Sequence, residues 1–254
     1  NASSSNLYYT YVSGGSFELT AAFESSKFKL GGDKDTVSTD GGSYPDLYEV
    51  GSNLSLAPLD YGDTSLVGYW KFDETTGTTA YDSSGRGNNG ILTNNPIWTA
   101  GKKRGALRFS LASQYVSKSI VSSSPVALSI SFWFNPDSIN SSYRDMVGVA
   151  DNDTGRFHLN NGDNAINWYP FINSGIIPVV GSWYYAVGVY DGLSKKIYVN
   201  GILRGTATNS TSFVFDRMKV GSDGEIFNGV LDEVSYYNRA LSASEVTALY
   251  NATR

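Results

Sequence analysis

Short segments in which apolar and polar residues alternate recur from Leu66 to the end of the chain, with no helical pattern between them. One of them, 126–134, places on one face its residues Leu128, Ile130, Phe132 and Phe134. Because successive side chains of a strand point to opposite faces, this pattern predicts strands that bury one face in a core. The predicted strands are 66–73, 106–109, 126–134, 146–150, 156–159, 165–169, 183–190, 195–199, 202–206, 213–220 and 229–237.

A tight hairpin is expected between two of these strands. Asn200-Gly201 separates two alternating runs, and Asn-Gly is typical of a type I′ turn because both residues tolerate a positive φ. Many short strands with no helices between them predict an all-β antiparallel sandwich or jelly roll. One short helix is expected at the C-terminus, where Ser242 and Glu245 fit a capping box, and it should pack on the sandwich.

The first part of the chain has a different character. Two short strand patterns, 7–12 and 16–23, flank Ser13-Gly14-Gly15 and predict a hairpin, and a stretch rich in Gly and Asp follows it. A single hairpin gives a thin core, so this segment should pack on another element. We therefore divide the chain into a β segment at 1–56, a linker at 57–65 and a sandwich at 66–254.

Composition excludes several kinds of site and partner. The 254 residues include no cysteine and one histidine, which excludes disulfides, thiolate metal sites and two-histidine metal sites. The net charge of −5, with no basic run, argues against nucleic acid and anionic membranes as partners. No apolar run approaches the ~20 residues that span a bilayer, and we recognise no signal-peptide pattern among the printed residues. The abrupt start at Asn1 is typical of a mature or trimmed fragment.

Residues 66–254 resemble a LamG-type, concanavalin A-like lectin/glucanase domain. The segments that carry the resemblance follow the order of the family: 68–74 (GYWKFDE), 82–90 (DSSGRGNNG), 105–109 (GALRF), 130–134 (ISFWF), 183–187 (WYYAV), 197–201 (IYVNG), 227–234 (FNGVLDEV) and 239–242 (RALS). Each segment alone is a weak signal, and their ordered combination is specific. The resemblance implies a jelly-roll β-sandwich, carbohydrate binding and an extracellular location.

Residues 7–56 resemble the C-terminal half of a type IV pilin-like protein or pseudopilin. The matching segments are 9–11 (YTY), 17–25 (FELTAAFES), 40–42 (DGG) and 48–51 (YEVG). In such proteins a long apolar N-terminal helix precedes this small β-sheet. The resemblance implies that this helix is missing here and that other pilin-like subunits are partners. Any contact with a membrane would then come only through the missing helix.

The lectin-like resemblance also implies a structural calcium ion. Relatives often hold Ca²⁺ between the first and last strands and a glycine loop, which maps to the carboxylates of Asp73 and Asp232 with carbonyls from Asn88 to Gly90. Ca²⁺ requires six to eight oxygen ligands, and these groups supply oxygen. The alternative is that Asp73 caps a turn and that Asp82 forms an Asx turn.

A second calcium loop follows from the pseudopilin resemblance. Pseudopilins bind calcium in a comparable acidic loop, which here would contain Asp33, Asp35 and Asp40. Lys34 interrupts these carboxylates, and an ordinary surface loop has the same density of Asp and Gly.

Sugar binding requires an exposed aromatic ring together with amides and carboxylates that recognise hydroxyl groups. Trp70, Trp133 and Trp183 lie in strand patterns and are expected in the core. The candidate platform is therefore Trp168 with Tyr169, and the polar residues near it are Asn160, Asn161 and Asp163. The alternative is that Trp168 fills the edge of the sandwich.

Catalytic machinery is not expected. Laminarinase-type relatives carry Glu-x-Asp-x-x-Glu on one strand, and no Glu here is followed two residues later by Asp. His158 lies in an alternating strand and reads as a half-buried or surface residue. The leading hypothesis is a non-enzymatic cell-surface or pilus-associated protein that binds glycans or another surface. The alternatives are a structural pilus subunit whose sandwich coats a filament without a ligand, and, less favoured, an enzyme that degrades polysaccharides.

Overall fold

The computed structural model describes residues 7–12, 16–21, 48–51, 64–123, 125–139, 144–149, 155–170, 172–208, 214–222 and 224–254. The chain divides into two compact units, residues 1–63 with 244–252 and residues 64–243 with 253–254. Within the first unit, β1 (Leu7–Val12), β2 (Ser16–Ala21) and β3 (Tyr48–Gly51) form an antiparallel sheet in that order. The antiparallel pairing of 7–12 with 16–21 agrees with the predicted hairpin, whose residues 13–15 and 22–23 lie outside the described residues, and β3 is an additional strand.

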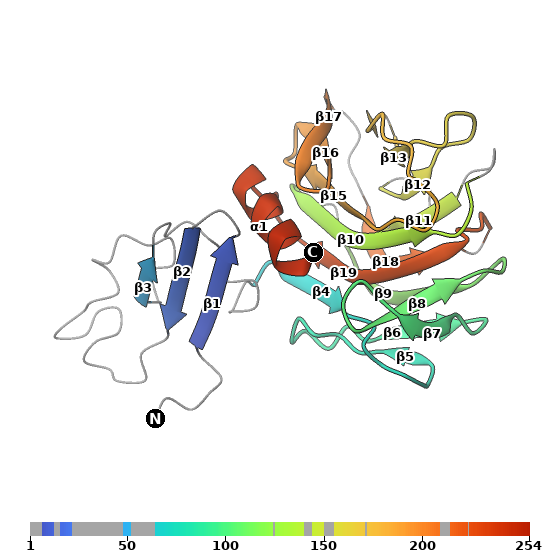
Figure 1. Cartoon of the computed structure of the whole chain (residues 1–254), viewed down its shortest axis with the longest axis horizontal. Coiled ribbons are helices and arrows are strands. Elements are labelled where there is room, and N and C mark those ends of the chain that lie inside the picture. Colours follow the sequence, from blue (N-terminus) through green and yellow to red (C-terminus); the bar gives the residue numbers. More distant parts are fainter. Residues whose placement is uncertain are drawn as a thin grey trace. The chain divides into compact units, whose positions relative to one another are not determined.

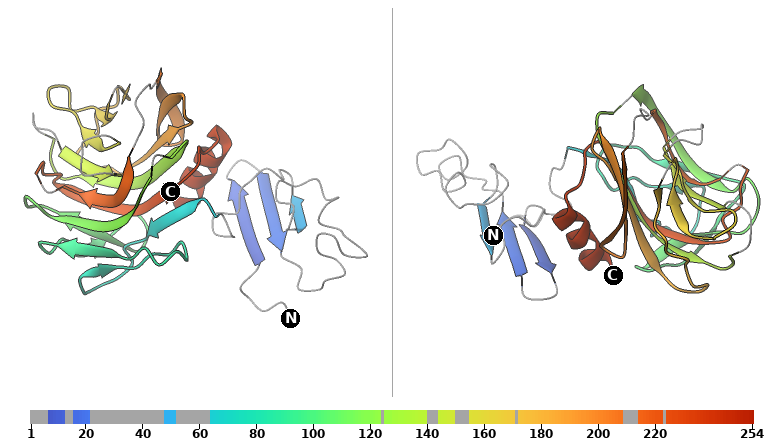
Figure 2. Two further views of the ribbon diagram at one scale, coloured as in Figure 1. Left: turned by 180° about the vertical axis from the view of Figure 1, so that it is seen from behind. Right: turned by 90° about the horizontal axis from the view of Figure 1, so that it is seen from above.

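The second unit consists of two eight-stranded antiparallel sheets that pack as a sandwich (Figures 1 and 2). One sheet has the order β17-β16-β15-β10-β19-β8-β7, with β4 also paired to β19. Its strands are β4 (Leu66–Trp70), β7 (Ile97–Ala100), β8 (Gly105–Phe109), β10 (Leu128–Pro136), β15 (Tyr184–Tyr190), β16 (Ser194–Val199), β17 (Ile202–Thr208) and β19 (Gly229–Tyr237). This sheet contains the longest alternating apolar segments of the sequence.

The opposite sheet has the order β14-β13-β12-β11-β18-β9-β6-β5. Its strands are β5 (Thr79–Ala80), β6 (Gly90–Thr93), β9 (Tyr115–Ser123), β11 (Arg144–Gly148), β12 (Phe157–Leu159), β13 (Ile166–Trp168), β14 (Ile172–Asn173) and β18 (Phe215–Gly221). Every pairing in both sheets is antiparallel, as the predicted jelly-roll sandwich requires.

Aromatic side chains join the two sheets in the core. Phe132 of one sheet meets Phe157 of the other edge-on, with ring centroids 5.0 Å apart. Gly188 leaves space beside this pair, because a Cβ there would lie 2.7 Å from Phe157 and 2.8 Å from Trp168. The buried Trp70 and Trp133 confirm the expectation that these residues belong to the interior, whereas Trp183 is half-buried.

Two local predictions are also confirmed. Asn200 and Gly201 have φ values of 53° and 76°, the positive pair that a type I′ turn between β16 and β17 requires. The C-terminal helix α1 (Ala243–Thr253) begins directly after Ser242, with Glu245 in its first turn, as the capping box predicts. No helix among the described residues has both the length and the apolar character that a bilayer crossing requires.

Candidate functional site

Three strands at one edge of the second sheet, β12, β13 and β14, and the turns between them contain the side chains predicted to bind a sugar. Phe157 and Leu159 point into the core, so His158 lies on the outer face. The strand registers place Asn173 opposite Asn167, Asn167 opposite His158, and His158 opposite Asp145. These four side chains form a polar row across β14, β13, β12 and β11, on the face of the sheet away from the core.

Tyr169 follows β13 and is the exposed aromatic residue of this region, with 43% of its surface accessible. The guanidinium of Arg156 lies 5.4 Å from the centre of its ring, and the ring of His158 lies 6.2 Å away. The Tyr169 backbone is fixed as well, since its N–H donates to Arg156 O at 2.9 Å and its carbonyl accepts from Gly155 N at 3.0 Å. The phenol is therefore presented on a rigid support.

Arg156 and Lys195 hold Tyr169 in place, the first through its ring and the second through its backbone carbonyl. Arg156 forms ion pairs with Asp145 at 3.0 Å and with Glu225 at 3.4 Å, which fixes its guanidinium beside the tyrosine ring. The Lys195 ammonium donates to the carbonyl of Tyr169 at 3.0 Å. Lys195 is fully buried, and burial lowers its pKa to about 7.

The turn between β12 and β13 forms a cluster around Asp163. Its carboxylate accepts hydrogen bonds from Asn160 Nδ2 at 3.0 Å, Asn173 Nδ2 at 2.7 Å and the Ala165 backbone at 3.0 Å. The Ala165 N–H is the largest cause of a lowered pKa at Asp163. Asn161 is exposed, and its side chain forms no hydrogen bond within the described part of the chain. The structure therefore brings Asn160 and Asp163 together, with Asn173 as a member that the sequence did not reveal.

Trp168 is not an exposed platform, and that part of the prediction is wrong. Its side chain has 0% of its surface accessible, and its ring stacks on Phe157 with centroids 5.4 Å apart and planes 9° apart. The reason is the strand alternation of β13, which points Ile166 and Trp168 inward and Asn167 outward. The alternative, a tryptophan that fills the sandwich, is confirmed.

His158, the one histidine of the chain, is buried, with 3% of its surface accessible, so the expectation of a half-buried or surface histidine is wrong. Burial lowers its pKa to about 4, and the nearby positive charge of Arg156 acts in the same direction. The imidazole is therefore neutral at physiological pH and belongs to the support beneath Tyr169.

Asp73 and Asp232, the two carboxylates predicted to bind calcium, lie against the loop that connects β7 to β8. Lys103 N donates to Asp232 Oδ2 at 3.0 Å, and Gly105 N donates to Asp73 Oδ1 at 3.1 Å. Glycine is needed at both ends of this loop, because a Cβ on Gly101 would lie 2.6 Å from Asp232 Oδ2 and one on Gly105 would lie 2.4 Å from the Phe72 carbonyl. The loop was not recognised in the sequence, although its GKKRG pattern, with a glycine at each end, was the available signal.

Asp232 is an unusual carboxylate, because it is fully buried and its Oδ1 atom has no hydrogen-bond partner in the described ranges. Burial, and after it the negative charge of Glu233, raises the pKa of Asp232 to about 8. The neighbouring Glu233 is buried as well, although side chains of adjacent strand residues normally point to opposite faces. A β-bulge interrupts that alternation: Glu233 has a φ of 51°, and the register of β19 against β10 shifts beside it. The Tyr69 hydroxyl donates to Glu233. An unpaired buried oxygen beside a second acid fits a bound cation.

Asn88 and Gly90 are organised around different partners. Asn88 O accepts from the Trp70 indole at 2.9 Å, and Asn88 N donates to Asp82 at 2.9 Å. Asp82 also accepts from Ser84 N at 2.9 Å, which is the Asx turn given as the alternative. Gly90 packs on Trp70 and Val116. No group of three or more His, Cys, Asp or Glu side chains suited to a metal ion occurs in the described residues. Asp33, Asp35 and Asp40 of the second predicted loop lie outside those residues.

Comparison with known proteins identifies the fold. The family model described as the concanavalin A-like lectin/glucanases superfamily matches residues 110–247, more than half of the chain. No curated protein matches the chain. None of these findings supports the pilin-like hypothesis for residues 7–56, which stays a prediction.

Several solved structures share the architecture. Domain 4 of AbnA, an extracellular GH43 arabinanase from Geobacillus stearothermophilus solved with arabinotriose, has a TM-score of 0.59 and 22% identity, covering 73% of this chain and 98% of that one. The binding domain of Paraclostridial Mosquitocidal Protein 1 has a TM-score of 0.62 and 16% identity, covering 75% and 52%. A Trypanosoma rangeli sialidase mutant has a TM-score of 0.55 and 14% identity, covering 74% and 33%.

The chain thus spans nearly the whole arabinanase domain, about half of the toxin binding domain and a third of the sialidase. Identities this low establish the fold alone. Since both binding domains and sialidase chains contain it, the fold is compatible with binding and with catalysis.

Proposed function

The chain belongs to the concanavalin A-like lectin/glucanase superfamily, and we propose that it is a non-catalytic, extracellular module of that superfamily that binds glycans around Tyr169. The observation that carries this proposal is the exposed Tyr169 ring, supported by Arg156 and set beside the polar row of β12 to β14. An aromatic face of this kind can stack on the C–H face of a sugar ring.

Polar groups near that ring can recognise sugar hydroxyls. Asn173, at the edge of the sheet, and Asn161, in the β12–β13 turn, are exposed, so their amides are accessible to a ligand. Asp163 holds Asn173 in place through a 2.7 Å hydrogen bond, which reduces the conformational entropy that binding would cost. Sites on open lectin-type surfaces are shallow, so a single site should bind weakly and multivalent display should supply avidity.

A structural calcium ion at Asp73 and Asp232 is the second part of the proposal. The unpaired Oδ1 of Asp232 and the loop that joins both carboxylates support it. When bound, the ion would neutralise a buried negative charge and connect the β7–β8 loop to β19 and to the segment that follows β4. Asn88 and Gly90 are not included, because their carbonyl and packing contacts lie with Trp70.

Binding to immobilised plant, bacterial and animal polysaccharides tests the glycan proposal. Wild-type protein should be retained on at least one polymer, and Tyr169→Ala should weaken that binding by about tenfold, the effect of losing ~1.4 kcal/mol of stacking. Tyr81→Ala is the matched control, because Tyr81 is 61% exposed and lies in the loop after β5.

Three results would contradict the proposal. Equal binding by wild type and Tyr169→Ala would place the ligand elsewhere. Release of new reducing ends from a polymer would show catalysis. Absence of binding across the panel would favour the alternative in which the sandwich is a structural coat.

A further inference from the structure

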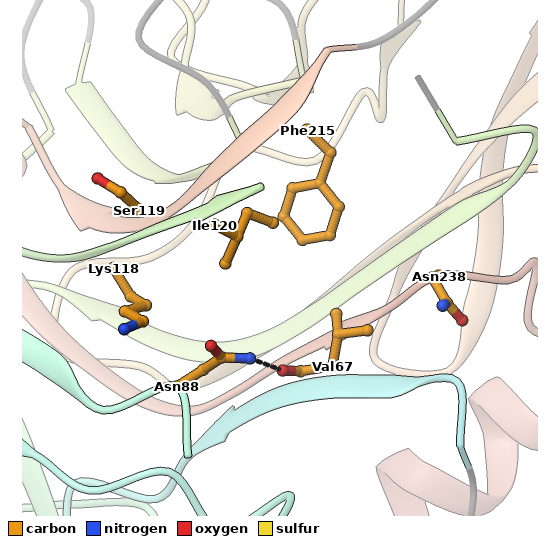
Figure 3. A pocket seen from close by; sticks show the side chains of 7 residues that line it. All are labelled: Val67, Asn88, Lys118, Ser119, Ile120, Phe215 and Asn238. Atoms are coloured by element: carbon orange, nitrogen blue, oxygen red, sulfur yellow. Dashed lines mark hydrogen bonds between the residues drawn. The ribbon is translucent and has the colours of Figure 1, made fainter. Parts of the chain in front are cut away.

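A pocket of about 580 Å³ opens in the sandwich unit, lined by residues of both sheets (Figure 3). The described residues that line it are Val67, Asn88, Lys118, Ser119, Ile120, Phe215 and Asn238. The volume lies within the range of about 300–1,000 Å³ that small-ligand sites occupy. None of the residues that form the Tyr169 surface lines it, so this pocket is a separate feature of the molecule.

The pocket has an apolar centre. Val67 comes from β4, Ile120 from β9 and Phe215 from β18, and the view in Figure 3 shows the three side chains in its middle. Val67 and Ile120 are only partly buried, although both pack against the hydrophobic core. Apolar surface left open at this point would gain free energy from contact with the apolar face of a ligand.

Polar groups flank this centre in the same view, with Lys118 and Asn88 on one side and Asn238 on the other (Figure 3). Lys118 forms no ion pair with any described residue, and none of the described lining residues is acidic. The described part of the wall therefore offers one positive charge without a counter-charge.

The side chain of Asn88 and the backbone of Asn238 are each fixed by a hydrogen bond, and both side-chain amides keep further atoms that can bind a ligand. Asn88 Nδ2 donates to Val67 O at 2.7 Å, and no described residue donates to Asn88 Oδ1. Asn238 is held by its backbone, whose N–H donates to Ser65 O at 2.8 Å, and its side-chain amide forms no hydrogen bond within the described residues. Both amides can therefore bind hydroxyl groups of a ligand.

We propose that this pocket binds a single acidic sugar of the uronate type, with its carboxylate at Lys118, its hydroxyls at Asn88 and Asn238, and its C–H face on Val67, Ile120 and Phe215. One ammonium matches one carboxylate, and a pyranose ring combines an apolar face with a hydroxyl rim. The inference does not depend on the Tyr169 surface.

Titration of the ¹⁵N-labelled full chain, followed by NMR, tests this assignment with three probes: methyl glucuronide, the neutral methyl glucoside, and octanoate. Methyl glucuronide should shift the amide signals of Lys118 and Asn238 and bind about tenfold more tightly than the glucoside, as expected for a hydrogen bond to a charged group. Lys118→Gln should remove that tenfold preference. Arg86→Gln, which deletes an exposed charge in the loop before β6, should leave it unchanged.

Val67→Phe is a second variant, which fills the pocket and keeps Lys118. It should abolish binding of both sugars. Its melting temperature is measured to confirm that it folds. Tyr169→Ala should leave glucuronide binding intact, which separates this inference from the proposed polymer site. The assignment is overturned if glucuronide shifts no signal of the pocket, if Lys118→Gln binds it as wild type does, or if octanoate binds there and glucuronide does not.

Discussion

Replacing Asp232 by Asn should stabilise the protein in the absence of calcium. Asp232 is buried, and burial raises its pKa from 3.8 to about 8. The folded state therefore holds a proton near pH 7 that the unfolded state releases. Stability from this group is fully present below pH 3.8 and is lost as the pH rises towards 8.

The magnitude follows from the interval between these pKa values. Neutral pH lies about three units above the ordinary pKa of 3.8, at which the carboxyl group of the unfolded chain ionises. Ionisation at neutral pH therefore lowers the free energy of the unfolded state by about 4 kcal/mol relative to the folded state, which keeps its proton. Asn removes this term, but its amide places an N–H donor where Oδ1 has no partner, which costs about 1–3 kcal/mol. The net stabilisation should be about 2 kcal/mol, or ~4–8 °C in melting temperature for a domain of this size.

Thermal unfolding in a chelator, and again with calcium in excess, measures both effects. Calcium at about 100 times its dissociation constant should stabilise wild type by ~2.7 kcal/mol and leave Asp232→Asn unchanged. Asp137→Asn, which removes an exposed carboxylate, is the control and should respond to calcium as wild type does. Destabilisation of Asp232→Asn in the chelator would refute the buried-charge reasoning, and an equal calcium response in both proteins would refute the site.

Three further outcomes are expected. Trp168→Ala should lose about 3–5 kcal/mol in urea unfolding, because it empties a core position, whereas Tyr169→Ala should change stability by less than ~0.5 kcal/mol. Wild type should lose up to about 3 kcal/mol of stability as the pH falls from 6.5 to 4, because the imidazole binds a proton in the unfolded state and stays neutral in the folded state. His158→Gln should remove this part of the pH dependence. Asp82→Ala should cost about 2–4 kcal/mol in the same unfolding assay, because it leaves the N–H groups of Tyr69, Ser84 and Asn88 without their acceptor.

The strand pattern was predictable from the sequence because it depends on local alternation. The strand expected at 229–237 is β19 with the same bounds, and the Asn200-Gly201 turn has the predicted geometry. The strand β9 was missed, because Ser117, Lys118 and Ser119 interrupt its apolar residues. Lys118 lies on the inward face of β9, where the alternation would place an apolar residue. It lines the pocket there and is therefore not buried in the core.

The candidate sites were less predictable, since they depend on contacts between distant segments. The Trp168 side chain fits into the core because Gly188, in the opposite sheet, has no Cβ. The sequence of β13 alone does not show that this space exists. The contact between Lys103 and Asp232 joins residues 129 positions apart. Asp73 and Asp232 were identified through family resemblance. The GKKRG pattern marks the loop at 101–105 in the sequence, but its contacts with both carboxylates depend on the folded chain.

A glycan-binding surface formed by Tyr169 and its polar neighbours can be located by NMR. The chemical shifts of the labelled protein are mapped with an oligosaccharide from the polymer that binds most tightly. We expect the shifted amides to cluster at Tyr169, Asn161 and Asn173. A bound oligosaccharide that shifts signals only on the other sheet, or at no part of β12 to β14, would contradict it.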